Sequence, residues 1–246
     1  MSDRLSGGDE DRAPGAPGGP RFIALEGPDG AGKSVQAVRL VEALREDGHI
    51  VTFTREPGGT HLGEQVRAVV LDPGPTPRCG EADALLFHAA RAQNVRDVIR
   101  PALARGEVVV TDRFLWSTRA YQGYGSGVPL ELIAGLEQLS VGGTVPGLVL
   151  LVDVPVRVGL ERRERGAREE QTRFEDEARH DEAFHGRVRG GYLAMAAADP
   201  GRWRVVDGDR PMDLVATDLL ALARAFLAGS EPAGAVERII GQAGRP

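Results

Sequence analysis

The sequence has 246 residues, of which 41% are hydrophobic and 27% are charged, a balance typical of globular proteins with one or two domains. Its formal net charge is −6, which argues against binding to nucleic acid or to a membrane through charge alone. The single cysteine, Cys79, excludes an internal disulfide framework, and no apolar run is long enough to cross a bilayer. Because the N-terminus carries no hydrophobic signal segment, we expect a cytoplasmic protein.

Short apolar runs alternate with longer helical patterns along the chain. Residues 1–20 are interpreted as a disordered tail, residues 21–228 as one domain and residues 229–246 as a C-terminal tail. The predicted strands are Phe22–Leu25, Ile50–Thr54, Val108–Thr111, Leu148–Asp153 and Trp203–Val206. The predicted helices are Ser34–Arg45, Leu62–Leu71, Ala82–Arg105 (kinked or restarted at Pro101), Leu130–Leu139, Val156–Arg165, Glu177–Ala198 and Leu214–Leu227. This alternation predicts an α/β fold, a parallel sheet with helices on both faces.

A phosphate-binding motif follows the first predicted strand. The segment Gly27-Pro28-Asp29-Gly30-Ala31-Gly32-Lys33-Ser34 fits the pattern G-x-x-x-x-G-K-S, and we expect all eight residues to bind ATP. In this P-loop, backbone N–H groups and the start of the next helix bind phosphates, the lysine places a point charge on the β- and γ-phosphates, and the serine hydroxyl ligates Mg²⁺. Lys33 is the only lysine in a chain with 29 arginines, so composition and motif indicate the same residue. A chance Gly-rich turn is the competing interpretation, and the flanking strand and helix disfavour it.

The second predicted strand ends in a rigid turn, Thr54-Arg55-Glu56-Pro57-Gly58-Gly59-Thr60. Arg55 could donate two hydrogen bonds to a phosphate, but a purely structural turn explains this segment equally well.

The third predicted strand leads into a polar segment, residues 112–123. An Asp at the end of an apolar strand of a P-loop protein usually belongs to the magnesium shell, which makes Asp112 a candidate ligand. Arg113 would then lie near the transferred phosphoryl group. Four further side chains offer hydroxyl, phenol or amide groups to a sugar or base: Ser117, Thr118, Tyr121 and Gln122. The alternative interpretation is a polar helix start without a binding role.

Taken together, these segments resemble the bacterial thymidylate kinases in order and spacing. The resemblance rests on Glu26-Gly27 and Gly32-Lys33-Ser34, on TREPGGT at 54–60, on Phe87-His88-Ala89-Ala90-Arg91 and on DR-x-x-x-STRAYQG at 112–123, and it covers residues 22–210. It implies a P-loop nucleoside monophosphate kinase with a five-stranded parallel sheet, usually a homodimer. The implied reaction transfers the γ-phosphoryl group of ATP to dTMP with Mg²⁺, giving dTDP and ADP.

The resemblance also implies residue roles in the dTMP site. Phe87 would stack on thymine and Arg91 would hydrogen-bond to it, in keeping with an i, i+4 spacing that puts both on one helix face. Without the family, Phe87 is better explained as a core aromatic residue. The remaining assignments are Ser117 and Thr118 near the base, Tyr121 and Gln122 along the deoxyribose, and Arg55 and Arg113 on the acceptor phosphate. Two departures stand out: Phe114 lacks the hydroxyl or imidazole of many relatives, and His88 replaces a common Tyr, a change expected to be harmless.

An arginine-rich stretch, about residues 160–176, resembles the mobile lid of the family. Relatives that lack a P-loop arginine take a catalytic cation from this lid, and the acidic Asp29 fits that subtype. Arg165 and Arg168 are therefore predicted to be catalytic together with Lys33, Asp29, Asp112 and Arg113, although Arg162 and Arg163 are nearly as good candidates. A solvated, charge-paired helix is the competing interpretation, since Glu and Arg interleave at helical spacing.

Two other functions stay open at this stage. One is a related kinase that acts on another monophosphate or on a deoxynucleoside. The other is a P-loop switch that binds nucleotide without phosphorylating a small molecule, which would have no use for the polar segment at 112–123.

Overall fold

A computed structural model describes residues 21–72, 78–166 and 182–230. The two predicted tails lie outside these ranges, apart from Gly229 and Ser230, as do residues 167–176 of the predicted lid. No helix in the described ranges combines the length and the apolar composition that a membrane crossing requires.

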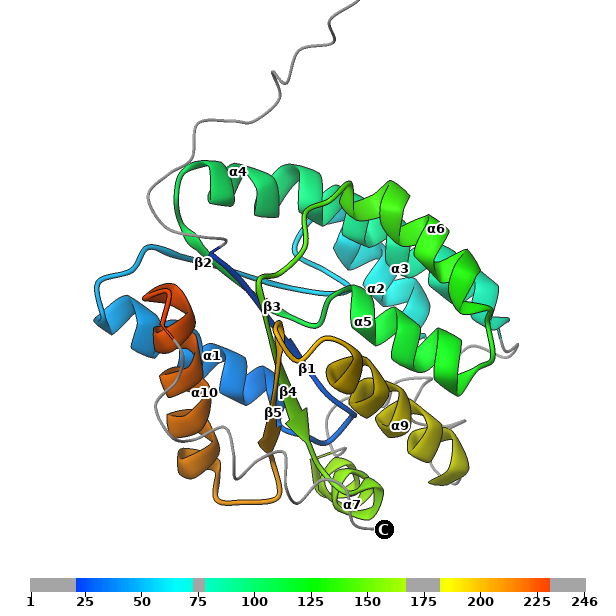
Figure 1. The fold of residues 1–246 in the computed structure, drawn as a ribbon. Helices are drawn as coiled ribbons and strands as arrows, with labels where there is room; N and C mark the ends of the chain where they lie inside the picture. The colour runs from blue at the N-terminus through cyan, green and yellow to red at the C-terminus, as the bar shows by residue number, and fades with distance from the viewer. Residues whose placement is uncertain (1–20, 73–77, 167–181, 231–246) are drawn as a thin grey trace, which may run out of the picture.

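The centre of the molecule is a five-stranded parallel sheet in the order β2-β3-β1-β4-β5 (Figure 1). The strands are β1 (Phe22–Glu26), β2 (Val51–Arg55), β3 (Val108–Asp112), β4 (Leu148–Asp153) and β5 (Trp203–Asp207). Every residue of β1, β3 and β4 is buried, which is why these segments read as continuous apolar runs rather than as alternating patterns. The predicted five-stranded parallel sheet is thus confirmed.

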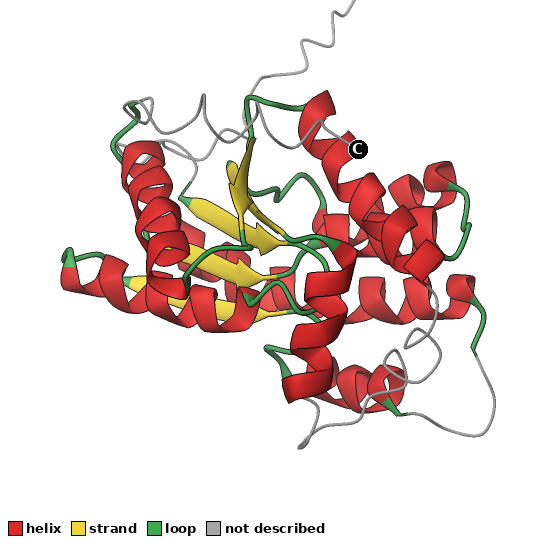
Figure 2. Cartoon of the chain, turned by 90° about the horizontal axis from the view of Figure 1, so that it is seen from below, coloured by secondary structure: helices red, strands yellow, loops and turns green. Residues whose placement is uncertain are grey.

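Helices cover both faces of the sheet (Figure 2). On one face, α1 (Lys33–Glu46) and α10 (Met212–Leu227) pack on Ile23, Leu25 and Leu150. On the other face, the sheet packs against α4 (Arg100–Ala104), α5 (Leu115–Thr118), α6 (Leu130–Val141) and α9 (Glu182–Ala198). The helices α2 (His61–Leu71) and α3 (Gly80–Asn94) pack on each other beside this layer, and α7 (Val156–Gly166) lies below the P-loop edge in Figure 1.

Two π-helical segments interrupt the predicted pattern. The long helix predicted over residues 82–105 consists of α3, the segment η1 (Val95–Ile99) and α4, and Pro101 lies in the first turn of α4, where its missing N–H has no helical partner to lose. Residues 115–125, for which the sequence favours either a binding segment or a helix start, form α5 and the π-helical segment η2 (Arg119–Gly125). A helix does start in this segment and it borders the cavity described below, while the binding role of the segment stays a prediction.

Candidate active site

One cavity of about 340 Å³ lies at the carboxyl ends of β1, β2 and β3. This is the edge at which parallel α/β sheets bind ligands. At one end it is lined by Asp29, Gly30 and Ser34 of the P-loop, and at the other by Phe87, Arg91, Thr118, Tyr121 and Gln122. Segments far apart in the sequence therefore enclose one continuous space.

The P-loop has the backbone form that phosphate binding needs. Gly30 and Gly32 have φ values of 76° and 84°, and α1 begins at the next residue, Lys33. The Lys33 ammonium is buried and donates a hydrogen bond of 2.8 Å to the carbonyl of Pro28. Burial and the nearby Arg113 guanidinium lower the pKa of Lys33 to about 8, although Asp29 and Asp112 partly oppose the shift.

Ser34 and Asp112 form the predicted metal pair. The Ser34 hydroxyl donates a hydrogen bond of 2.6 Å to Oδ2 of Asp112. The other carboxylate oxygen, Oδ1, is buried and has no partner among the described residues. An oxygen donor set with an unsatisfied carboxylate oxygen suits Mg²⁺, which binds one or two protein oxygens and takes the rest from phosphates and water. These two residues therefore fit the metal.

Arg113 and Asp29 form an ion pair between β3 and the P-loop. Arg113 has a positive φ of 70°, which turns its side chain toward Gly27, and its guanidinium carbon lies 5.1 Å from the centre of the Tyr121 ring. Burial alone would raise the pKa of Asp29, but the charges of Arg113, Lys33 and Arg163 outweigh it and lower the pKa to about 2. Asp29 is therefore a carboxylate at any working pH.

Glu26, at the end of β1, connects three segments of the site and is fully buried. Its carboxylate accepts hydrogen bonds from the Phe114 N–H (2.9 Å), the Ser117 hydroxyl (2.6 Å) and the Tyr192 hydroxyl (3.1 Å). Burial raises the pKa of Glu26 despite these donors and the charge of Arg113. In this arrangement Ser117 is bound to Glu26 and Tyr192, so its hydroxyl serves the turn after β3.

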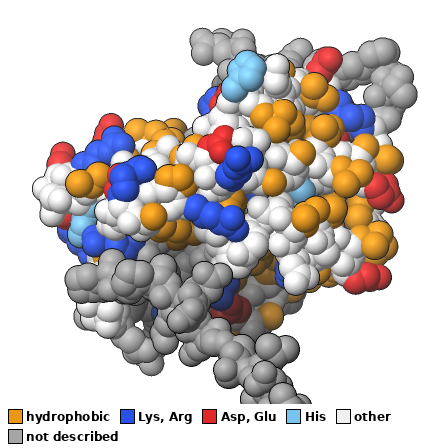
Figure 3. All heavy atoms as spheres, turned by 90° about the horizontal axis from the view of Figure 1, so that it is seen from above, with side chains coloured by type: hydrophobic (Ala, Val, Ile, Leu, Met, Phe, Trp, Pro, Cys, Tyr) orange, Lys and Arg blue, Asp and Glu red, His pale blue; other side chains and the backbone are white. Residues whose placement is uncertain are grey.

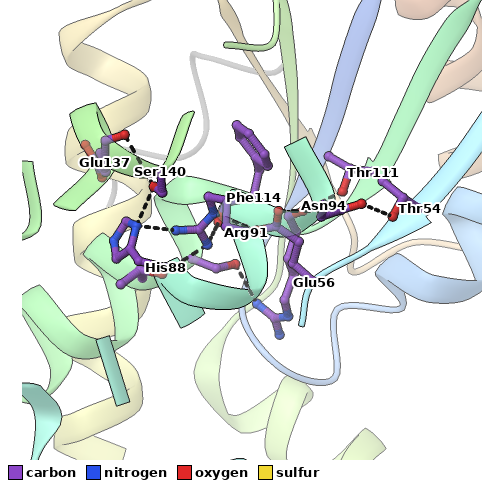
Figure 4. Close-up of polar contacts among 12 residues, drawn as sticks. Thr54, Glu56, His88, Arg91, Asn94, Thr111, Phe114, Glu137 and Ser140 are labelled. Atoms are coloured by element: carbon purple, nitrogen blue, oxygen red, sulfur yellow. Dashed lines mark hydrogen bonds and ion pairs between the residues drawn. The ribbon is translucent and has the colours of Figure 1, made fainter. Parts of the chain in front are cut away.

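Arg91 of α3 is the largest fully buried side chain among the described residues, yet it borders the cavity. Its Nε donates a hydrogen bond of 2.7 Å to Oε2 of Glu56, which follows β2 (Figure 4). Burial raises the pKa of Glu56, and this effect outweighs the charge and the hydrogen bond of Arg91, which lower it. A buried guanidinium needs such a partner, because an unpaired charge in the interior is very costly.

The structure distributes the other predicted dTMP residues unevenly. Phe87, Tyr121 and Gln122 border the cavity, and Tyr121 and Gln122 are buried. Arg55 does not border it; its half-exposed guanidinium lies 3.2 Å from Glu64 of α2. The role of Arg55 on the acceptor phosphate stays a prediction that requires this ion pair to open.

Among the described lid arginines, Arg163 reaches the cavity. Its side chain is 13% exposed, and its guanidinium lies 4.0 Å from Oδ2 of Asp29. Arg162 instead donates to the carbonyl of Gly208, at 2.9 Å, and Arg165 is 75% exposed and paired with Glu161 in the preceding turn. Arg168 lies outside the described residues, so its predicted role is not tested.

Sequence reasoning missed three residues of the site, Glu26, Glu56 and Tyr192, and gave Arg163 only as a competing candidate. Glu26 and Glu56 stand inside the motifs of the family, and their position at strand ends was an available signal. Arg163 is one of four lid arginines between which the sequence pattern does not discriminate. Tyr192 carries no sequence signal, because only the packing of α9 brings its hydroxyl to Arg113 and Ser117.

Comparison with known proteins agrees with this geometry. Residues 25–219 match the family model described as thymidylate kinase. The chain belongs to the thymidylate kinase family. It is 49% identical to the thymidylate kinase of Alcanivorax borkumensis over 199 residues, which cover 81% of this chain and 93% of that one. It is 50% identical to the thymidylate kinase of Thermomicrobium roseum over 195 residues, 79% of this chain and 90% of the relative.

A solved structure agrees at the level of the fold. The crystal structure of thymidylate kinase from Ehrlichia chaffeensis superimposes with a TM-score of 0.66 at 30% sequence identity, over 82% of this chain and 97% of that one. The predicted P-loop nucleoside monophosphate kinase fold and the resemblance to the thymidylate kinase family are thus confirmed.

Proposed function

We propose that this chain transfers the γ-phosphoryl group of ATP to the phosphate of dTMP, giving ADP and dTDP. The observation that carries the proposal is that one cavity runs from the P-loop to Phe87 and Arg91. A nucleotide switch would not need the far end of this cavity, which has room for a base opposite the P-loop. The match to thymidylate kinases across nearly the whole described chain supports dTMP as the acceptor.

Binding of the donor begins with the P-loop amides and Lys33, which hold the β- and γ-phosphates of ATP. Ser34 and Asp112 would hold Mg²⁺, which neutralises negative charge on the phosphate oxygens when it is bound. The acceptor needs no strong general base, because a nucleoside monophosphate has its second pKa near ~6 and is already a dianion at neutral pH. Catalysis then consists of positioning and of stabilising charge on the transferred group.

Arg113 would stabilise that charge from the acceptor side. Its guanidinium lies between the P-loop and Tyr121, where acceptor and donor phosphates must meet. Asp29 holds Arg113 in this position, and Arg163 adds a second cation from α7. We propose Arg163 as the catalytic lid arginine in the described arrangement, with Arg165 and Arg168 as the competing assignments.

The far end of the cavity would hold the base and sugar. Phe87 offers a ring face for stacking, and Arg91 offers a hydrogen-bond donor to the base. The Thr118 hydroxyl accepts a hydrogen bond from Arg91 in this part of the cavity. Tyr121 and Gln122 line the part that would hold the sugar. The Tyr121 ring, buried against Arg113, would discourage a 2′-hydroxyl.

We also propose a homodimer in the cytoplasm. Apolar side chains are exposed on adjoining helices: Leu85 of α3 is 56% exposed and Leu132 of α6 is 57% exposed. Orange side chains gather on the right-hand side in Figure 3, the side on which Figure 1 places α3 and α6. Light scattering on the purified chain should give a mass near twice the 26.2 kDa of one copy, and a monomer would contradict the proposal.

ADP release by the purified chain tests the activity. The assay uses ATP with dTMP, dUMP, dCMP, dGMP, AMP or thymidine as acceptor, with and without excess chelator for Mg²⁺. We expect the highest kcat/KM with dTMP and no release in chelator. Highest activity with another acceptor would assign the chain to a related kinase, and tight ATP binding without acceptor-dependent release would favour a switch.

A further inference from the structure

The guanidinium of Arg91 is almost fully committed to protein acceptors. Its Nε is bonded to Glu56, and its Nη2 donates to the Phe114 carbonyl at 3.2 Å and to Oγ1 of Thr118 at 3.1 Å. Its Nη1 lies 3.2 Å from Nδ1 of His88, one turn earlier in α3 (Figure 4). A guanidinium has five N–H groups, so the residues that the structure describes engage four and leave one, on Nη1.

The hydrogen bond to Arg91 fixes the state of His88. Arginine can only donate, so we assign the lone pair to Nδ1 and the proton of the neutral ring to Nε2. Burial and the charge of Arg91 lower the pKa of His88 to about 3, so the ring is neutral. Its Nε2 is buried without a partner among the described residues, which costs stability. Packing alone does not favour a histidine at such a position, whereas the contact with Arg91 does.

A second helix also contacts the imidazole. Oγ of Ser140, in α6, lies 2.9 Å from Nδ1 of His88. The Ser140 hydroxyl can give its hydrogen to this atom or to the carbonyl of Glu137. His88 does not border the cavity, so it cannot touch a nucleotide there. Whatever it contributes passes through Arg91.

We propose that His88 is a positioning residue: by engaging one Nη1 hydrogen of Arg91, it leaves a single N–H directed at the base of the acceptor nucleotide. A single donor pairs with a ring carbonyl oxygen and not with an amino group, which is itself a donor. Arg91 thereby favours a pyrimidine with a carbonyl at that edge over one with an amino group, and His88 fixes the direction of the donor that makes this distinction. This inference rests on the proposed function and assigns part of its base selectivity to a residue outside the pocket.

Three variants test the role of the imidazole. His88→Leu removes the acceptor, His88→Asn keeps an acceptor at the δ position, and Ser140→Ala removes the other contact of Nδ1 as a matched control. For each, kcat and KM are measured for dTMP and for ATP, with dCMP as the amino-bearing competitor and thermal unfolding as a check on folding.

We expect His88→Leu to raise the KM for dTMP by about tenfold, the effect of losing one well-placed hydrogen bond, and to narrow the preference for dTMP over dCMP. Its kcat and its KM for ATP should stay within about twofold of wild type, as for a change remote from the reacting atoms. His88→Asn should restore the KM for dTMP, and Ser140→Ala should leave it within about twofold.

The outcomes separate the inference from the proposed function. An unchanged KM for dTMP in His88→Leu, or an equal rise in Ser140→Ala, overturns the inference while activity on dTMP stands. If wild type does not phosphorylate dTMP, the proposed function fails, and the same comparison is made with the monophosphate that it does accept. If His88→Leu does not fold, His88→Phe, which keeps a ring without an acceptor, takes its place.

Discussion

Lys33 carries its positive charge in a buried position, and this makes its charge state sensitive to pH within a working range. Its pKa of about 8 lies well below the ordinary lysine value because burial and Arg113 disfavour the ammonium. In the free protein, the ammonium is therefore present below pH 8 and is lost as the pH rises above it. ATP keeps its full negative charge above pH 8. The attraction between the P-loop and the ATP phosphates therefore weakens there only because Lys33 loses its positive charge.

We predict that ATP affinity of the free chain is constant below about pH 7.5 and falls above pH 8, approaching a tenfold loss per pH unit. Calorimetric titration with ATP at a series of pH values measures this directly. The Lys33→Met variant should bind ATP weakly and without this pH dependence, and its turnover should fall by about a thousandfold, as for loss of a preorganised charge at the reacting group. A flat affinity profile for wild type between pH 7 and 9.5 would contradict the assignment.

At the scale of elements, the P-loop and α7 are in backbone contact. A Cβ atom at Gly159 of α7 would lie 2.6 Å from the carbonyl oxygen of Asp29, and one at Gly30 would lie 2.0 Å from the carbonyl oxygen of Gly159. Neither neighbour is a flexible side chain that could move aside. The two glycines therefore set how close the helix that carries Arg163 comes to the P-loop.

We predict that Gly159→Ala lowers stability by about 1–3 kcal/mol through overpacking, and raises the KM for ATP because the P-loop must shift. Gly135→Ala is the matched control, since Gly135 lies in α6 and a Cβ atom there would meet no other described residue within 4 Å. There alanine should leave activity unchanged and stabilise the helix by up to about 1 kcal/mol. Thermal unfolding and initial rates at varied ATP separate the two; equal behaviour of both variants would show that the P-loop tolerates the displacement.

How far the sequence predicts this architecture depends on the range of the interactions involved. The strand β3 and the start of the helix after the P-loop follow from local patterns, and the predicted bounds of both lie within about two residues of the observed ones. The helix α5 was given only as an alternative interpretation, because its order comes from distant partners: Trp116 packs against Trp203 of β5 with ring centres 5.2 Å apart, and Ser117 bonds to Glu26. Contacts between residues so far apart in the sequence leave no local periodicity.

The same reason separates the predicted site from the observed one. Motifs indicated Lys33, Ser34 and Asp112, whose predicted roles follow from their places beside one loop and one strand. They could not indicate that Arg55 pairs with Glu64 or that Arg91 is held by Glu56, since a sequence pattern does not state which partner a side chain chooses. Roles that rest on a family motif stay predictions at these positions.

At the scale of the whole molecule, three segments converge on the carboxylate of Asp29. Arg113 comes from the end of β3, Lys33 from the start of α1 and Arg163 from α7, and all three lower the pKa of Asp29. This convergence joins the P-loop, the turn after β3 and the helix α7 through one charge. A cation from α7 therefore lies beside the P-loop, while Arg165 of the same helix is 75% exposed and pairs with Glu161.

We predict that Arg163→Ala lowers kcat by about a hundredfold, the order expected for one lost charge on the transferred group, with a smaller change in the KM for dTMP. Arg157→Ala is the control, because Arg157 lies in α7, is 80% exposed and pairs only with Glu161 among the described residues; its kcat should stay near wild type. Arg165→Ala decides between the assignments. A large loss of kcat there, with little loss in Arg163→Ala, would mean that the lid rearranges around bound nucleotide to exchange one arginine for the other.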